Sequence, residues 1–229
     1  MISGDGKLPL LEILPGRFYG PCSGRDISIA IELFGNLIDR FTFCDLSYRG
    51  PNFSAKEAVP DNWALTSRVQ GFDQAVPEKT TWYGRSPFRP RSTLESWRRP
   101  DLSEVLIELR CDLAQDVLTE QFAPGSISAF MHINDGTGEG GSDLWFLTSP
   151  SMLAERTDHA KEFLPQLVRR LCDGAIVVTD GVLTDPNFRC DKSFELAHGR
   201  WELISSFSNA RRPDRPLRAW RVNKPAGKE

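Results

Sequence analysis

Short apolar runs alternate with segments of helical periodicity along most of this 229-residue chain, and this alternation limits its fold more than any other feature. Run 105–109 has the apolar character of a strand, and run 175–178 is apolar and β-branched in its middle, which is typical of a strand buried on both faces. Segment 153–171 instead repeats apolar residues at the spacing of one helical face. Strands that alternate with helices predict an α/β fold, with a mostly parallel twisted sheet and helices on both faces.

The pattern also predicts where each element lies. The expected strands are 17–19, 41–44, 105–109, 127–133, 175–178, 201–207 and 217–222, and the expected helices are 26–34, 113–121 and 153–171. The last two strands flank a turn-rich stretch and should form a terminal antiparallel hairpin. Residues 49–100 are rich in proline and arginine, so we expect a long insertion after the second strand of a single domain, 1–229.

Charge and cysteine usage restrict the class of protein. The formal net charge of −3 gives no electrostatic basis for binding nucleic acid or an anionic membrane. No apolar run approaches the roughly 18 residues that span a bilayer, and the first residues lack the pattern of a secretory signal. The five cysteines have no zinc-type spacing. We therefore expect a cytoplasmic protein with reduced thiols that makes no contact with a membrane.

A turn of small residues follows the first predicted strand. It reads Gly20-Pro21-Cys22-Ser23-Gly24, and a side chain at such positions would keep a ligand away from the backbone. Asp45 ends the second predicted strand, 21 residues after Gly24. A carboxylate at about this spacing is suited to accept hydrogen bonds from both ribose hydroxyls of a nucleotide. The alternative is a tight strand-to-helix turn beside a solvated acid.

Polar groups also follow the later predicted strands. Asp112 follows the third strand, where it can equally cap the helix 113–121. The fourth strand runs into a stretch with four glycines that contains His132, Asn134, Asp135, Glu139 and Asp143. Its acids and amide can accept hydrogen bonds from a substrate or hold a hard cation, and His132 can act as a base. The alternatives are a surface loop and a buried histidine with structural partners.

This order of elements resembles the class I S-adenosylmethionine-dependent methyltransferases over residues 15–222. The resemblance implies that S-adenosylmethionine binds along Gly20, Cys22, Ser23 and Gly24, with Asp45 on the ribose and Asp112 on the adenine amino group. It implies methyl transfer to an oxygen or nitrogen of a small-molecule substrate. Asp135 and His132 would be catalytic, and Asn134, Glu139 and Asp143 would hold the substrate. Asp135 and Asp180 also resemble the metal pair of catechol-type O-methyltransferases, although two solvated acids are the simpler interpretation.

Two residues depart from the family pattern. Cys22 stands where the family usually has its middle glycine, and Phe18 stands where it usually has an acid. These departures favour an alternative function: a non-catalytic binding or interaction protein with a degenerate cofactor site.

Overall fold

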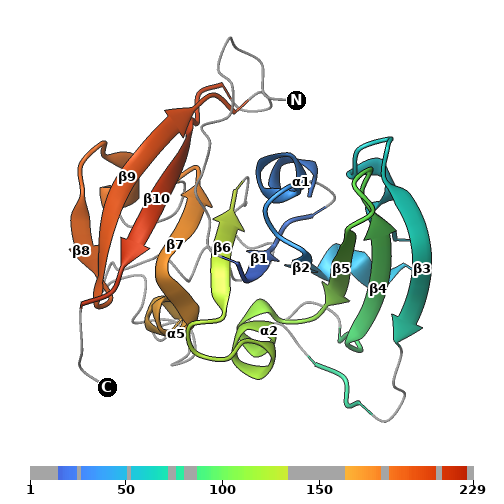
Figure 1. Ribbon diagram of the computed structural model, residues 1–229. Coiled ribbons are helices and arrows are strands. Elements are labelled where there is room, and N and C mark those ends of the chain that lie inside the picture. The colour runs from blue at the N-terminus through green and yellow to red at the C-terminus, as the bar shows by residue number, and fades with distance from the viewer. Residues whose placement is uncertain are drawn as a thin grey trace.

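The computed structural model describes residues 15–24, 27–50, 53–71, 76–79, 87–133, 163–181, 186–209 and 213–225. Within these ranges, ten strands form one sheet with the order β3-β4-β5-β2-β1-β6-β7-β10-β9-β8 (Figure 1). The strands are β1 (Arg17–Pro21), β2 (Arg40–Cys44), β3 (Ala64–Gly71), β4 (Arg91–Arg98), β5 (Glu104–Cys111), β6 (Ile127–His132), β7 (Leu171–Thr179), β8 (Phe194–Leu196), β9 (Gly199–Phe207) and β10 (Leu217–Asn223).

Three α-helices lie in the same ranges: α1 (Ser28–Phe34), α2 (Ala114–Gln121) and α5 (Phe163–Arg170). Short 3₁₀ helices occur at η1 (Leu46–Arg49), η2 (Ala55–Glu57) and η4 (Pro186–Arg189). None of the helices in the described ranges has the length and apolar character needed to cross a bilayer.

The predicted fold class is wrong in its balance of strand directions and in its helices. Four strand pairings are parallel, β1–β2, β1–β6, β2–β5 and β6–β7. Five are antiparallel, β3–β4, β4–β5, β7–β10, β9–β10 and β8–β9. The sheet is therefore mixed rather than mostly parallel, and the three α-helices of the described ranges, of seven or eight residues each, are too few to cover both faces of its ten strands.

The parallel strands form the centre of the sheet in the order β5-β2-β1-β6-β7. Their neighbouring side chains point to opposite faces, as the strand repeat of two requires. Phe18 of β1 thus belongs to the apolar cluster that contains α1, whereas Tyr19 belongs to the cluster on the other face with α2 and α5. All six residues of β6 are buried, as expected for a central strand covered on both sides.

The insertion 49–100 is part of this same sheet and core. It contains β3 and β4, which extend the sheet as antiparallel strands beyond β5. Its tryptophans Trp63 and Trp97 are 8% and 3% exposed and pack in the cluster that contains α1. They are core residues, so they do not form a stacking surface for a ring.

The ends of two predicted helices can be compared with the structure. The helix expected over 26–34 corresponds to α1, whose N-cap residue is Ile27, and Asp26 lies outside the described residues. The end of the helix expected over 153–171 is predicted to within one residue, since α5 ends at Arg170 and β7 begins at Leu171. Gly174 lies inside β7 with φ +76°, where the β6–β7 register shifts, and it marks an irregularity of the strand.

Arg99 joins the β4–β5 hairpin to the end of α1. Its side chain is 8% exposed, and its guanidinium donates to the carbonyl oxygens of Gly35 at 2.8 Å and Ile38 at 2.6 Å. It also forms an ion pair with Asp39 at 2.7 Å and lies over the ring of Trp63. A cation is favourable at this end of a helix, where carbonyl groups lack helical partners. Arg99 is therefore a structural residue, although its neighbour Arg98 is exposed.

We predict that Arg99→Met lowers the free energy of unfolding by about 3 kcal/mol, because buried carbonyl groups and one carboxylate lose their donor. Arg98→Met is the matched control and should change it by less than about 0.5 kcal/mol. Urea denaturation of both variants measures the difference. Equal stabilities would show that the Arg99 contacts do not hold the hairpin to α1.

Candidate functional site

The carboxyl ends of the central parallel strands bring most of the predicted site residues to one edge of the sheet. Strands β2 to β5 all lie on one side of β1 in the sheet, and β6, the next strand of the chain, lies on the other side of β1. The strand order therefore reverses between β1 and β6. Open α/β sheets bind ligands in the crevice outside the strand ends at such a point. The glycine turn, residues 20–24, begins with the last two residues of β1 and continues beyond the strand, Asp45 follows β2, and Asp112 follows β5.

The glycine turn and Asp45 are in direct contact. The backbone N–H of Gly24 donates to Oδ2 of Asp45 at 2.8 Å, and the N–H of Ser47 donates to its Oδ1 at 2.7 Å. Asp45 is half-buried and is the N-cap of η1. A carboxylate has about four lone-pair sites, so Asp45 keeps acceptor capacity after these two hydrogen bonds.

Two residues of the turn have left-handed backbone conformations. Gly24 has φ +55° and Cys22 has φ +48°. A left-handed conformation costs a residue with a Cβ about 1–2 kcal/mol. Cys22 therefore stands in a backbone position that suits glycine. A Cβ added to Gly24 would have no atom of the described residues within 4 Å, so among them the space in front of Gly24 is open.

Position 20 requires a glycine because of packing in the core, whereas the sequence suggested that a ligand approaches the backbone there. A Cβ at Gly20 would lie 2.8 Å from Cε1 of Phe18 and 3.0 Å from Cδ1 of Phe43. Phe18 is fully buried, with ring centroids 5.2 Å from those of both Phe41 and Phe43. The absence of a side chain at Gly20 is thus required by aromatic packing, whatever else binds at the turn.

Ser23 connects the turn to η1. Its hydroxyl lies 2.8 Å from the hydroxyl of Tyr48 and donates to the carbonyl oxygen of Gly20 at 3.2 Å. Tyr48 is 4% exposed, and burial together with the charge of Asp45 raises its pKa well above the usual value. Tyr48 is therefore a neutral hydrogen-bonding residue that holds the turn against η1.

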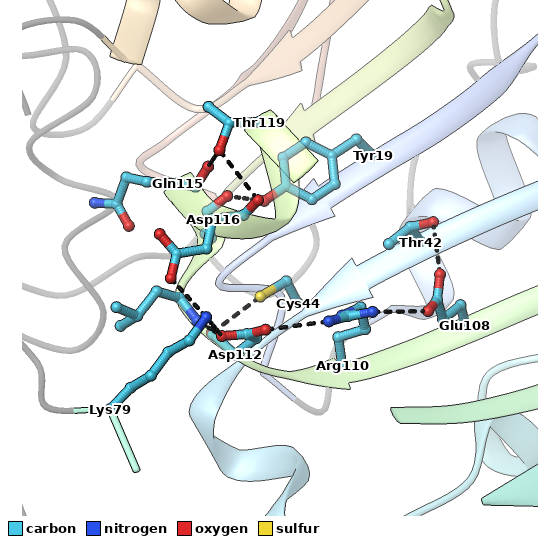
Figure 2. Close-up of polar contacts among 12 residues, drawn as sticks. Tyr19, Thr42, Cys44, Lys79, Glu108, Arg110, Asp112, Gln115, Asp116 and Thr119 are labelled. Carbon is cyan, nitrogen blue, oxygen red and sulfur yellow. Dashed lines mark hydrogen bonds and ion pairs between the residues drawn. The ribbon is translucent and has the colours of Figure 1, made fainter. Parts of the chain in front are cut away.

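Asp112 lies in a buried group of charges rather than at an open strand end (Figure 2). Its Oδ1 accepts from Nζ of Lys79 at 2.8 Å, and its Oδ2 accepts from Arg110 at 3.1 Å. Nζ of Lys79 also donates to Asp116 at 2.6 Å. Burial lowers the pKa of Lys79, but the hydrogen bonds and charges of the two aspartates outweigh it and hold the pKa above its usual value. Asp112 also partners the start of α2: the N-cap residue is Leu113, which forms no cap hydrogen bond with its own side chain, but Oδ1 of Asp112 accepts from the N–H of Leu113 at 2.8 Å.

The same charges continue along β5. Arg110 donates to Glu108 at 3.3 Å, and Glu108 in turn accepts from the hydroxyl of Thr42 on β2 at 3.5 Å. Burial opposes the charge of Arg110, but Glu108 and Asp112 raise its pKa overall. Each carboxylate of this row has a cationic partner, which compensates for much of its desolvation.

The other predicted site residues fall into two groups. His132 is 1% exposed within β6, and Asp180 is 4% exposed directly after β7. Asp180 is therefore buried rather than solvated. The remaining four lie outside the described residues: Asn134, Asp135, Glu139 and Asp143. The described part of the chain contains no group of three His, Cys, Asp or Glu residues that could hold a metal ion.

A separate hollow of about 520 Å³ lies at the opposite end of the sheet. The β8–β9 turn and the end of β10 line it, with Glu195, His198, Arg200 and Lys224 among its polar residues. Ala197 and His198 form the turn with φ +50° and +66°. This hollow shares no residue with the carboxyl edge of the parallel strands.

Sequence reasoning missed Lys79, Arg110, Asp116 and Tyr48. A signal existed for Arg110, because Glu108, Arg110 and Asp112 alternate along one face of an otherwise apolar strand. Asp112 and Asp116 are also four residues apart at the start of a helical pattern. No sequence signal points to Lys79, whose contacts cross 33 and 37 residues.

Comparison with known proteins does not assign the chain to a group: no family model matches it, and no curated protein matches it.

We predict that Gly24→Ala lowers the free energy of unfolding by about 1 kcal/mol through the backbone alone, since its Cβ meets open space. Gly50→Ala is the control, because Gly50 also has open space but φ −76°, and it should be neutral or slightly stabilising. Urea denaturation compares the two variants. Equal changes in stability would mean that Gly24 does not hold the left-handed conformation.

A second prediction concerns alkaline pH. Burial is the largest cause that raises the pKa of Cys111 to about 11. Above pH ~9 the unfolded chain loses this proton while the folded chain keeps it, so stability falls as the pH rises from 9 to 11. Cys111→Ala should make this decline shallower, whereas Cys190→Ala, at an exposed thiol, should leave it unchanged. Urea unfolding at several pH values measures both, and identical slopes would contradict the prediction.

Proposed function

We propose that the chain binds S-adenosylmethionine at the carboxyl edge of β1 and β2 and transfers its methyl group to an oxygen or nitrogen of a small molecule. The observation that carries this proposal is the 2.8 Å contact between the N–H of Gly24 and Asp45 at the point where the strand order reverses. It brings a left-handed glycine turn and a half-buried carboxylate together at the place where open α/β sheets bind ligands.

The residues of the turn fit the cofactor. Asp45 has lone pairs available for two ribose hydroxyls, and the open space at Gly24 allows the methionine part to approach the backbone. Asp112 has the position that the resemblance gives to the acid on the adenine amino group.

The bound cofactor would supply an activated methyl group, and the chain would supply alignment. Methyl transfer depends largely on holding the nucleophile in line with the methyl carbon and sulfur, so few catalytic side chains are needed. Asn134, Glu139 and Asp143 would position the substrate, and Asp135 or His132 would take the proton that its nucleophile releases. The buried position of His132 suits orientation of the substrate better than exchange of protons with water.

No metal ion is needed for this proposal. Asp180 is the described half of the suggested metal pair, and Asp135 lies outside the described residues. None of the five cysteines, all of which are described, is in a disulfide, and we propose a cytoplasmic setting for the enzyme.

A second candidate is a binding protein whose cofactor site is degenerate. Two observations favour it: Lys79 and Arg110 already bind the carboxylate of Asp112, and Phe18 packs against the base of the turn. In that case the charged group near α2 would have only a structural role.

We predict that S-adenosylhomocysteine raises the melting temperature, because a ligand that binds only the folded state stabilises it by about 2.7 kcal/mol at 100 times its Kd. Asp45→Ala should abolish this shift, whereas Asp61→Ala, at an exposed acid in the insertion, should retain it. Thermal unfolding with and without the ligand gives both results. The absence of any shift at millimolar ligand would reject the methyltransferase proposal in favour of the binding protein.

A further inference from the structure

Lys79 comes from the insertion, yet its ammonium group contacts two acids near the start of α2. Nζ lies 2.8 Å from Asp112 and 2.6 Å from Asp116, across 33 and 37 residues of chain (Figure 2). The backbone of Lys79 is held separately by a two-hydrogen-bond bridge to Phe88, with N···O distances of 2.8 and 2.9 Å. Both the main chain and the side chain of Lys79 are thus anchored.

The hydrogen bonds to Asp112 leave little room for another donor. Its Oδ1 accepts from Lys79 and from the N–H of Leu113, and its Oδ2 accepts from Arg110. The side chain of Asp112 is 2% exposed, while that of Lys79 is 22% exposed. Lys79 therefore lies between Asp112 and solvent, as the more accessible member of the pair.

We propose that Lys79 is an internal competitor for Asp112, so that a ligand with an exocyclic amino group reaches this carboxylate only by displacing the lysine. This inference rests on the proposed function, because it takes Asp112 as the acid that receives the adenine amino group. It adds a residue of the insertion that sets the affinity and base preference of the site.

Asp116 lowers the free-energy cost of moving the ammonium group of Lys79 away from Asp112. Its side chain is 35% exposed, so the ammonium group can leave Asp112 while keeping one carboxylate partner and gaining water. Arg110 stays on the other oxygen of Asp112, so the acid keeps a cationic neighbour when an amino group replaces Lys79. The charge of Lys79 thus moves over a short distance without losing all of its compensation.

The test compares ligand affinities in the full chain by isothermal titration calorimetry. Lys79→Met removes the ammonium group and keeps the length of the side chain, so S-adenosylhomocysteine should bind about tenfold more tightly if the displaced state is about one-tenth populated in the original chain. Lys56→Met, at an exposed lysine of the same insertion, should leave the affinity unchanged.

A second ligand distinguishes competition at Asp112 from a general change of the site. S-inosylhomocysteine has a carbonyl oxygen where the adenine amino group would be, and this oxygen cannot donate to a carboxylate. Its affinity should not rise in Lys79→Met. If this variant does not fold, Lys79→Gln is the second neutral variant, with the same gain expected.

Hydrogen exchange gives a readout that does not depend on the variants. In the original chain, S-adenosylhomocysteine should accelerate exchange of the amides of Lys79 and Phe88, because displacement of the side chain loosens the bridge. Equal affinity of the original chain and Lys79→Met, with unchanged exchange, would overturn the role of Lys79 and leave the proposed function standing. If no variant binds S-adenosylhomocysteine at millimolar concentration, the proposed function and this inference both fail.

Discussion

The structure depends on one constraint: its central parallel strands are buried on both faces. Phe18 and Tyr19 are adjacent in β1 and both fully buried, but they belong to apolar clusters on opposite sides of the sheet. A strand in this position can place few polar side chains along its length without compensating partners. The candidate site therefore lies where the parallel strands end, with the turn at Gly24 after β1 and Asp45 after β2.

The same constraint explains why the charged group around Asp112 is fully partnered. The row formed by Glu108, Arg110 and Asp112 lies on a partly covered face, and Lys79 completes it from the insertion. Removing one member of such a group leaves a charge uncompensated, which costs more than the original pair contributes. The insertion is consequently tied to the centre of the molecule by charge near α2 and by apolar packing at Trp63 and Trp97.

Sequence reasoning found the individual strands better than the sheet. Apolar runs such as 105–109 and 175–178 are strands because β-branched and apolar side chains fit a pleated surface, which is covered on both sides at 175–178 and alternately buried and half-buried at 105–109. Residues 64–71 and 91–98 were assigned to an insertion because all of β3 and the ends of β4 are exposed, so that a clear apolar alternation is absent. These residues form β3 and β4, which pair antiparallel with each other and with β5. The sheet is therefore mixed at this edge, where the sequence predicted an insertion. The end of the helix expected over 153–171 was predicted to within one residue, because its apolar residues repeat on one helical face up to the start of β7.

By itself the sequence determined the local features of this protein: the strand segments, the glycine turn, and the acids that follow β2, β5 and β7. These depend on neighbouring residues, through apolar periodicity and the freedom of glycine. Only the tertiary structure decided that Gly24 meets Asp45, that Phe18 accounts for Gly20, and that Lys79 binds Asp112. Such contacts join residues far apart in the chain, and their energies depend on burial and direction, which no local pattern records.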